Sequence, residues 1–134
     1  MFLLKRIVVL AAVIACFFVP AKTVPNIEII NRQCFNQLVS EVGDAERAIN
    51  DVFDKLLSDT ITNGYNYKFQ DVVGDDHIWG NAACNGNLPP DDCTKCLDIA
   101  KDYILQLCGF AGGAHCKLQD CRLRYEPYEF NSDW

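Results

Sequence analysis

Residues 84–96 read CNGNLPPDDCTKC, and this stretch decides the fold. Its cysteines follow the spacing Cys-x8-Cys-x2-Cys around a loop rich in Asn, Gly and Pro, which favour turns. Pro90 fits the first turn of a helix, and the carboxylates of Asp91 and Asp92 stabilise the positive end of a helix dipole. We therefore predict a helix over residues 91–108, which Gly109 ends. Its apolar residues recur at helical spacing along one face: Cys93, Cys96, Leu97, Ala100, Ile104, Leu107 and Cys108.

The sequence before this stretch predicts a second helix and three strands. Asp44 is suited to cap the helix, because its carboxylate can accept hydrogen bonds from the free N–H groups of the first turn. Alternating side chains predict strands near residues 27–34, 65–69 and 77–84. The apolar stripe of the second helix comprises Ala45, Ala48, Ile49, Val52, Phe53 and Leu56.

The sequence after residue 108 predicts one further strand. It follows a Gly-rich bend at residues 109–113, and its alternation slips by one residue, which suggests a β-bulge at Gln119 and Asp120. Residues 131–134 are expected to be a frayed tail. The pattern as a whole predicts an α+β fold, in which two helices pack on one face of an antiparallel sheet of four or five strands.

The N-terminal residues have the pattern of a secretory signal peptide. A short basic region precedes an unbroken apolar run over residues 7–19, and Val19-Pro20-Ala21 places small residues before a cut after Ala21. The run is too short to span a bilayer as an uncleaved anchor. We predict that residues 1–21 are removed and that residues 22–134 form a single domain with no membrane association.

Composition limits the functions that the chain can have. The 134 residues carry a net charge of −6, with no run of basic residues, which argues against binding to nucleic acid or to anionic membranes. Neither histidine belongs to a motif with a nucleophile, and the chain has no Gly-rich phosphate loop. We therefore expect no enzymatic activity, no catalytic residues and no cofactor.

Seven cysteines follow the signal peptide, and in an oxidising compartment they indicate a disulfide framework with one thiol left over. Cys93 and Cys96 lie too far along the predicted helix from Cys108 for a bridge, since a disulfide needs Cα atoms within about 7 Å. A bridge from Cys116 to Cys121 is also excluded if both lie in one extended strand. The remaining pairings stay open on this reasoning.

The chain resembles the ginkbilobin-type antifungal domain. The resemblance is carried by Cys84-x8-Cys93-x2-Cys96, by Gly64-Tyr65-Asn66-Tyr67 before it and by Cys108-x12-Cys121-x3-Tyr125-Glu126 after it, and it covers roughly residues 27–130. This domain occurs in plant cysteine-rich secretory proteins and is repeated in cysteine-rich receptor-like kinases and plasmodesmata-located proteins. The resemblance implies two helices on a five-stranded antiparallel sheet. It also implies the disulfides Cys34–Cys108, Cys84–Cys93 and Cys96–Cys121, with Cys116 unpaired.

Ginkbilobin-type domains are linked with mannose binding and antifungal action. Glu126 matches the glutamate among the family's sugar contacts, whereas His115 stands where the family has arginine and Phe35 where it has asparagine. The resemblance therefore implies a carbohydrate site at Glu126, His115 and Phe35, in which the Phe35 ring can pack on a sugar face. We further hypothesise that acidic extracellular fluid charges His115 and so restores a cationic donor.

Two functions follow as expectations. The first is a secreted defence protein of the apoplast that binds mannose or a fungal wall glycan and restrains fungal growth. The second is an extracellular protein-interaction module without lectin activity. The departures from the family at Phe35 and His115 keep the second open.

The cysteines have alternative roles. Cys93 and Cys96 could form a redox pair, but the neighbouring aspartates oppose thiolate formation and favour a structural role. Cys116 could be a buried inert thiol, a redox-sensitive site or an inter-chain bridge in a homodimer, and the bridge is slightly preferred. A zinc site is a less favoured alternative, drawn from Cys93, Cys96, Cys108, His115, Cys116 and Cys121.

Overall fold

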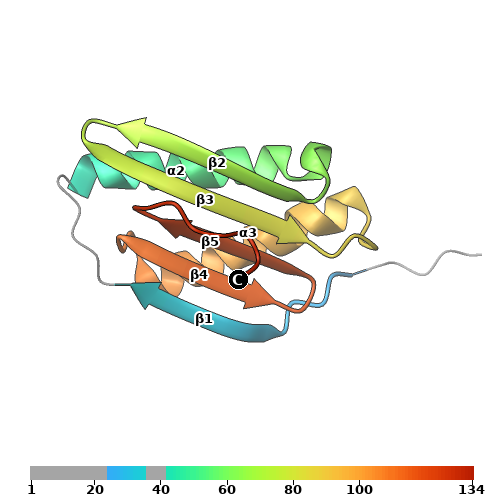
Figure 1. The fold of residues 1–134 in the computed structure, drawn as a ribbon. Coiled ribbons are helices and arrows are strands. Elements are labelled where there is room, and N and C mark those ends of the chain that lie inside the picture. Colours follow the sequence, from blue (N-terminus) through green and yellow to red (C-terminus); the bar gives the residue numbers. More distant parts are fainter. Residues whose placement is uncertain (1–23, 36–41) are drawn as a thin grey trace, which may run out of the picture.

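Two helices cover one face of a five-stranded antiparallel sheet in the computed structural model, which describes residues 24–35 and 42–134 (Figure 1). The strands lie in the order β1-β4-β5-β3-β2. The predicted fold class is thereby confirmed. In chain order the elements are β1 (Ile29–Phe35), α2 (Val42–Asp59), a short 3-10 helix η1 (Ile61–Asn63), β2 (Asn66–Val73), β3 (Asp76–Cys84), α3 (Pro90–Cys108), β4 (Gly113–Leu118) and β5 (Cys121–Glu126).

The predicted signal peptide lies outside the described residues. Within residues 24–35 and 42–134, neither helix is long and apolar enough to cross a membrane.

Helix α2 packs against β2 and β3 through the predicted stripe, whose side chains are at most 1% exposed. It begins at Val42, so Asp44 lies inside the first turn and is not the N-cap residue that we expected. There the Asp44 carboxylate pairs with the guanidinium of Arg47, one turn along the helix. A carboxylate in the first turn still stabilises the helix dipole.

Helix α3 packs against β4, β5 and β1. It spans Pro90–Cys108, and Gly109 follows as the cap that ends it, as the sequence predicts; the φ of 57° at this position favours glycine. The predicted stripe is buried from Cys93 to Ile104, but Leu107 is 49% exposed and lies outside the core.

A hairpin replaces the predicted β-bulge. Residues 113–126 form the two antiparallel strands β4 and β5, joined by Gln119 and Asp120. The slip in alternation is therefore the reversal of the chain: Cys116 pairs with Leu123 across the hairpin, and both point into the core. Because this segment forms two strands and not the single strand that we predicted, the sheet has five strands.

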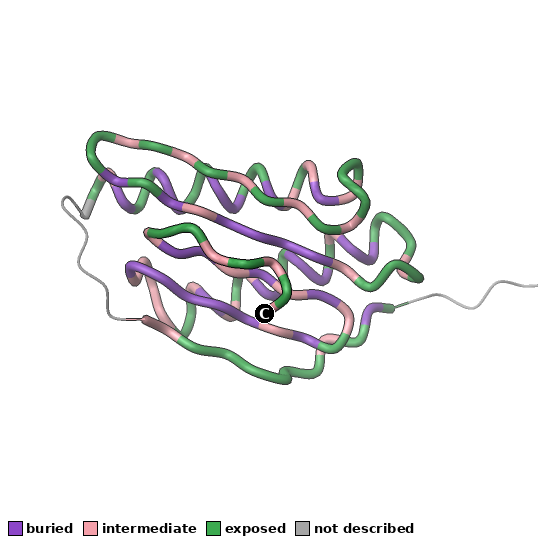
Figure 2. The backbone as a smooth tube through the Cα atoms, in the orientation of Figure 1, coloured by how far each residue is buried: buried purple, intermediate pink, exposed green. Residues whose placement is uncertain are grey.

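Three disulfides tie α3 to the sheet. Cys34–Cys108 joins its last turn to β1, Cys84–Cys93 joins its first turn to the end of β3, and Cys96–Cys121 joins it to β5. These are the pairs that the family resemblance implies. Buried residues concentrate in the central strands, whereas the edge strand β1 is largely exposed (Figure 2).

Candidate functional site

The face of the sheet opposite the helices, here called the outer face, displays three rows of side chains. Successive residues of a strand point to opposite faces, so the register of the ladder fixes each row. The first row contains Phe35, Gly113, Glu126 and Trp79; the middle row contains Gln33, His115, Arg124, Asn81 and Lys68; the third row contains Asn31, Lys117, Arg122, Ala83 and Asn66. The predicted carbohydrate residues all lie in the first and middle rows.

Phe35 and His115 are in direct contact on this face. Their ring centroids lie 5.6 Å apart. His115 is only 9% exposed, and its Nδ1 atom has no hydrogen-bond partner within the described residues. A buried ring nitrogen without a partner is an unmet hydrogen-bonding group, and a ligand hydroxyl reaches it only when the side chains that cover it move aside.

Glu126 is fully buried and fixes a neighbouring arginine. Its Oε1 atom accepts a hydrogen bond of 3.2 Å from Nε of Arg124, whose side chain is 17% exposed. Its other carboxylate oxygen lies over Gly113, where an added Cβ would come within 2.3 Å of it. The carboxylate therefore has little room to move, and it holds the Arg124 guanidinium in a defined place.

Arg124 is the residue that our sequence analysis missed. It lies directly across the β4–β5 ladder from His115, the residue that the family resemblance aligns with an arginine. The donor lost at residue 115 thus has a counterpart on the adjacent strand. The signal was present in the sequence, because Arg124 and Glu126 share one face of any strand that contains both.

The environment of His115 opposes the predicted charging in acid. Burial lowers the pKa of its imidazole below the ordinary value, and the nearby charges of Arg124 and Lys117 lower it further. Charging of His115 therefore needs a more acidic fluid than charging of a free imidazole, which disfavours the hypothesis that mild acid restores a cationic donor. In its neutral form the ring has one donor and one acceptor nitrogen.

The C-terminal residues are ordered on the outer face, which corrects the predicted frayed tail. After β5 the chain turns back and crosses the helix-free side of the sheet (Figure 1). The ring of Phe130 lies 4.3 Å from the guanidinium carbon of Arg124, and the ring of Trp134 lies 5.5 Å from that of His115. The tail therefore borders the predicted carbohydrate site.

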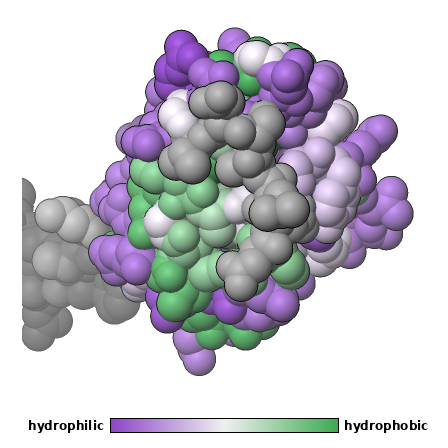
Figure 3. Space-filling view, turned by 90° about the vertical axis from the view of Figure 1, so that its left-hand side faces the viewer, coloured by the Kyte–Doolittle hydropathy of each residue, from purple (hydrophilic) through white to green (hydrophobic). Residues whose placement is uncertain are grey.

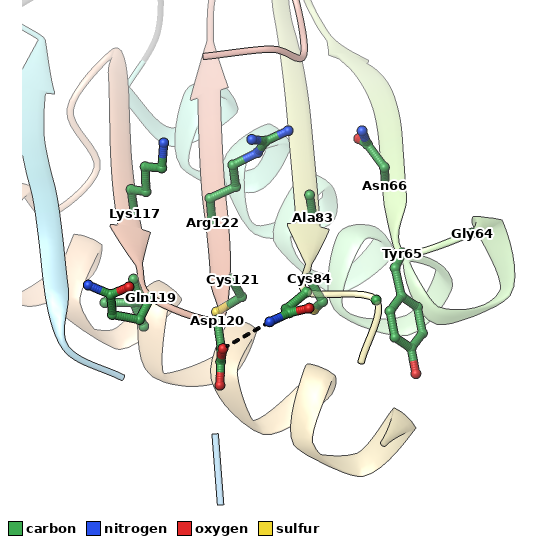
Figure 4. Close-up of a pocket in the computed structure, with 13 residues that line it drawn as sticks. Gly64, Tyr65, Asn66, Ala83, Cys84, Lys117, Gln119, Asp120, Cys121 and Arg122 are labelled. Atoms are coloured by element: carbon green, nitrogen blue, oxygen red, sulfur yellow. Dashed lines mark hydrogen bonds between the residues drawn. The ribbon is translucent and has the colours of Figure 1, made fainter. Parts of the chain in front are cut away.

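A polar groove of about 420 Å³ runs along the third row (Figure 4). The side chains of Lys117, Arg122 and Asn66 line it, and Asp120 lies at its lower end. The Asp120 carboxylate accepts hydrogen bonds from the main-chain N–H of Asn26 at 2.7 Å and from the side chain of Asn85 at 3.4 Å. Asp120 thus has a structural role, and none of the predicted carbohydrate residues lines this groove.

The structure assigns roles to the cysteines. Cys93 and Cys96 are bonded to different partners, so they do not form a redox pair with each other. Four cysteines of the zinc alternative are in disulfides, and no cluster suited to a metal occurs within the described part of the chain.

Among the residues that the structure describes, Cys116 is the free cysteine, and it is fully buried on the core side of β4. Our preference for an inter-chain bridge is therefore wrong for this fold, because the sulfur cannot reach a second chain while the core is closed. Burial raises the pKa of its thiol to about 11, which suppresses the reactive thiolate.

Comparison with known proteins shows the family to which the chain belongs. The profile of the family described as salt stress response/antifungal (Stress-antifung) matches residues 31–128. The chain belongs to this family. Relatives of this Stress-antifung protein include antifungal protein ginkbilobin-like protein 1 of Picea sitchensis, which is 27% identical over 87% of the chain and 89% of the relative.

Other relatives are longer. Plasmodesmata-located protein 8 of Arabidopsis thaliana is 31% identical over 58% of the chain, and the match spans 31% of that protein. The crystal structure of the tandem DUF26 ectodomain of the Arabidopsis thaliana cysteine-rich receptor-like protein PDLP8 matches with a TM-score of 0.68 at 22% identity. That match covers 77% of the chain and 50% of the ectodomain, so it shows a shared fold.

Proposed function

We propose that this protein is a secreted plant defence protein of the apoplast, without enzymatic activity, that binds a mannose-like carbohydrate and restrains fungal growth. The observation that carries the proposal is the gathering of Phe35, His115, Arg124 and Glu126 on one helix-free face. Similarity to ginkbilobin-like proteins named as antifungal supports the defence role.

Each side chain has a distinct part in this proposal. Arg124 supplies forked donors for a pair of hydroxyls, and Glu126 acts by fixing the Arg124 guanidinium. Nδ1 of His115, which has no partner within the described residues, exchanges one hydrogen bond with the sugar. The ring of Phe35 packs on the apolar side of the sugar.

A mannose titration by calorimetry tests the proposal. Glu126→Gln keeps the size of the side chain but removes the charge that orients Arg124, and Glu126→Ala removes the contact. Hydrogen bonds to charged groups contribute about 1.5–3 kcal/mol, so we expect affinity to fall by roughly 10- to 100-fold. Glu46→Gln, an exposed carboxylate on α2, is the matched control and should bind as the parent does. Unchanged affinity in both Glu126 variants would remove Glu126 from the site.

A protein-interaction role is the alternative, and the edge of the sheet favours it. Ile29 and Ile30 of β1 are 41% and 50% exposed, and an open edge strand can pair with a strand of a partner. Hydrophobic surface also gathers on the end of the molecule shown in Figure 3. A glycan array separates the two functions: mannose-rich hits support the carbohydrate site, and a blank array favours the protein partner.

A further inference from the structure

The C-terminal segment, residues 128–134 and here called the strap, lies on the outer face without entering the core. Every residue of the strap keeps some solvent exposure, and none belongs to the hydrophobic core cluster. The strap is held instead by polar and cation–π contacts, several of them with β5. Nη2 of Arg122 donates a hydrogen bond of 2.6 Å to the carbonyl of Ser132, and the rings of Phe130 and Trp134 lie over guanidinium groups.

Trp134 completes the hydrogen bonding of a buried amide. Its Nε1–H donates to Oδ1 of Asn81 at 3.0 Å. Asn81 has no solvent exposure, and its amide nitrogen already donates to Asn66 and to the carbonyl of Tyr67 at 2.9 Å each. The orientation of the Asn81 side chain is thus fixed with or without the strap. Removal of Trp134 would leave Oδ1 as a positioned acceptor.

The strap contacts the same polar groups that a bound saccharide would contact. The Trp134 ring lies 5.6 Å from the Arg124 guanidinium carbon and 5.5 Å from the His115 ring. Without the strap, the middle row presents the Arg124 donors beside the Asn81 acceptor. Sugar hydroxyls both donate and accept, so a saccharide could replace the indole at both groups.

We propose that the strap is an internal competitor of the carbohydrate site, and that a saccharide bound at Arg124 displaces Trp134. This inference rests on the proposed function, since it concerns regulation of the same site. Cation–π contacts are individually modest in strength, which suits a segment that opens reversibly. Its tether keeps the strap at high local concentration, which favours the closed arrangement.

The effect of the strap on mannose affinity can be measured. The apparent affinity of a ligand falls in proportion to the fraction of time for which its site is open. If the strap is closed for about nine-tenths of the time, its loss tightens mannose binding about tenfold. We therefore expect Trp134→Ala to bind mannose about tenfold more tightly than the parent. Asn131→Ala, an exposed strap residue for which the structure gives no side-chain contact, is the matched control and should bind as the parent does.

A second measurement reports on the strap without depending on mannose affinity. The chain has two tryptophans, so Trp79→Phe leaves Trp134 as the sole indole emitter. We expect acrylamide to quench Trp134 several-fold less efficiently than the same tryptophan in a peptide of residues 127–134. Saturating mannose should raise the quenching toward that of the peptide.

The outcomes separate the two proposals. If acrylamide quenches Trp134 in the protein as efficiently as in the peptide, the strap is not packed on the outer face. Mannose binding that leaves Trp134 protected, or equal affinity of Trp134→Ala and the parent, overturns the competition. A protected Trp134 together with no mannose binding to the parent or to Trp134→Ala rejects the carbohydrate function and leaves the strap as a structural element.

Discussion

Gly80 allows α2 to pack directly on β3. A Cβ atom at this position would lie 2.3 Å from Cγ1 of Val52 and 2.8 Å from Cδ1 of Leu56. We expect Gly80→Ala to lower the free energy of unfolding by about 1–3 kcal/mol, because the overpacked side chains or the helix must shift. Gly43→Ala is the control, since nothing lies within 4 Å of its added Cβ. Urea denaturation measures both, and equal midpoints would contradict the packing argument.

Cys116 should behave as a protected thiol. Because its pKa is raised to about 11, a thiol reagent at pH 8 should leave the native, non-reduced chain of residues 22–134 unlabelled. One thiol per chain should react after unfolding in guanidinium, and none in Cys116→Ala. A reducible dimer on a non-reducing gel would show instead that Cys116 reaches a second chain.

Prediction of the site from sequence depended on comparing single positions with the family. That comparison selected Glu126, His115 and Phe35 as candidates, but it could not select Arg124, which lies across the β4–β5 ladder from His115. A cross-strand neighbour is defined by register, and register follows from the hairpin, which the sequence pattern did not reveal. The role of Trp134 depends on its contact with Asn81 in β3, far away in the chain.

The disulfides differ in the length of chain that they close, and this predicts an order of stabilisation. Sequence separations are 74 for Cys34–Cys108, 25 for Cys96–Cys121 and 9 for Cys84–Cys93. Chain entropy alone assigns them about 4.5, 3.5 and 2.6 kcal/mol. Replacement of each pair by alanines, followed by guanidinium denaturation, should reproduce this order. A larger loss for Cys84–Cys93 than for Cys34–Cys108 would mean that native contacts outweigh loop length.

Helices were easier to predict than the hairpin, for local reasons. The stripes of α2 and the first four turns of α3 are encoded in side-chain spacing, and Pro90 and Gly109 mark the ends of α3. The loop at Gln119 and Asp120 contains neither glycine nor asparagine, so it lacks the usual hairpin signature. It is supported by distant segments, because the main-chain N–H groups of Gln119 and Asp120 donate to the carbonyls of Glu28 and Asn26.

The stability of the whole molecule should fall in mild acid, partly through His115. The pKa of His115 in the folded chain lies below its value in the unfolded chain, which is about 6.5. As the pH falls through this value, the unfolded chain takes up a proton that the folded chain resists, so unfolding becomes easier. We expect the urea midpoint of the parent to fall between pH 7.5 and 5, and that of His115→Gln to fall less. Parallel curves would show that His115 does not contribute.

All three covalent links meet α3, on the side of the sheet away from the candidate site. The disulfides and the candidate site therefore lie on opposite sides of one sheet. Substitutions among the outer rows can alter what the domain recognises while the cross-linked layer behind them stays intact. Such a division allows the residues of the candidate site to change without loss of the framework that carries them.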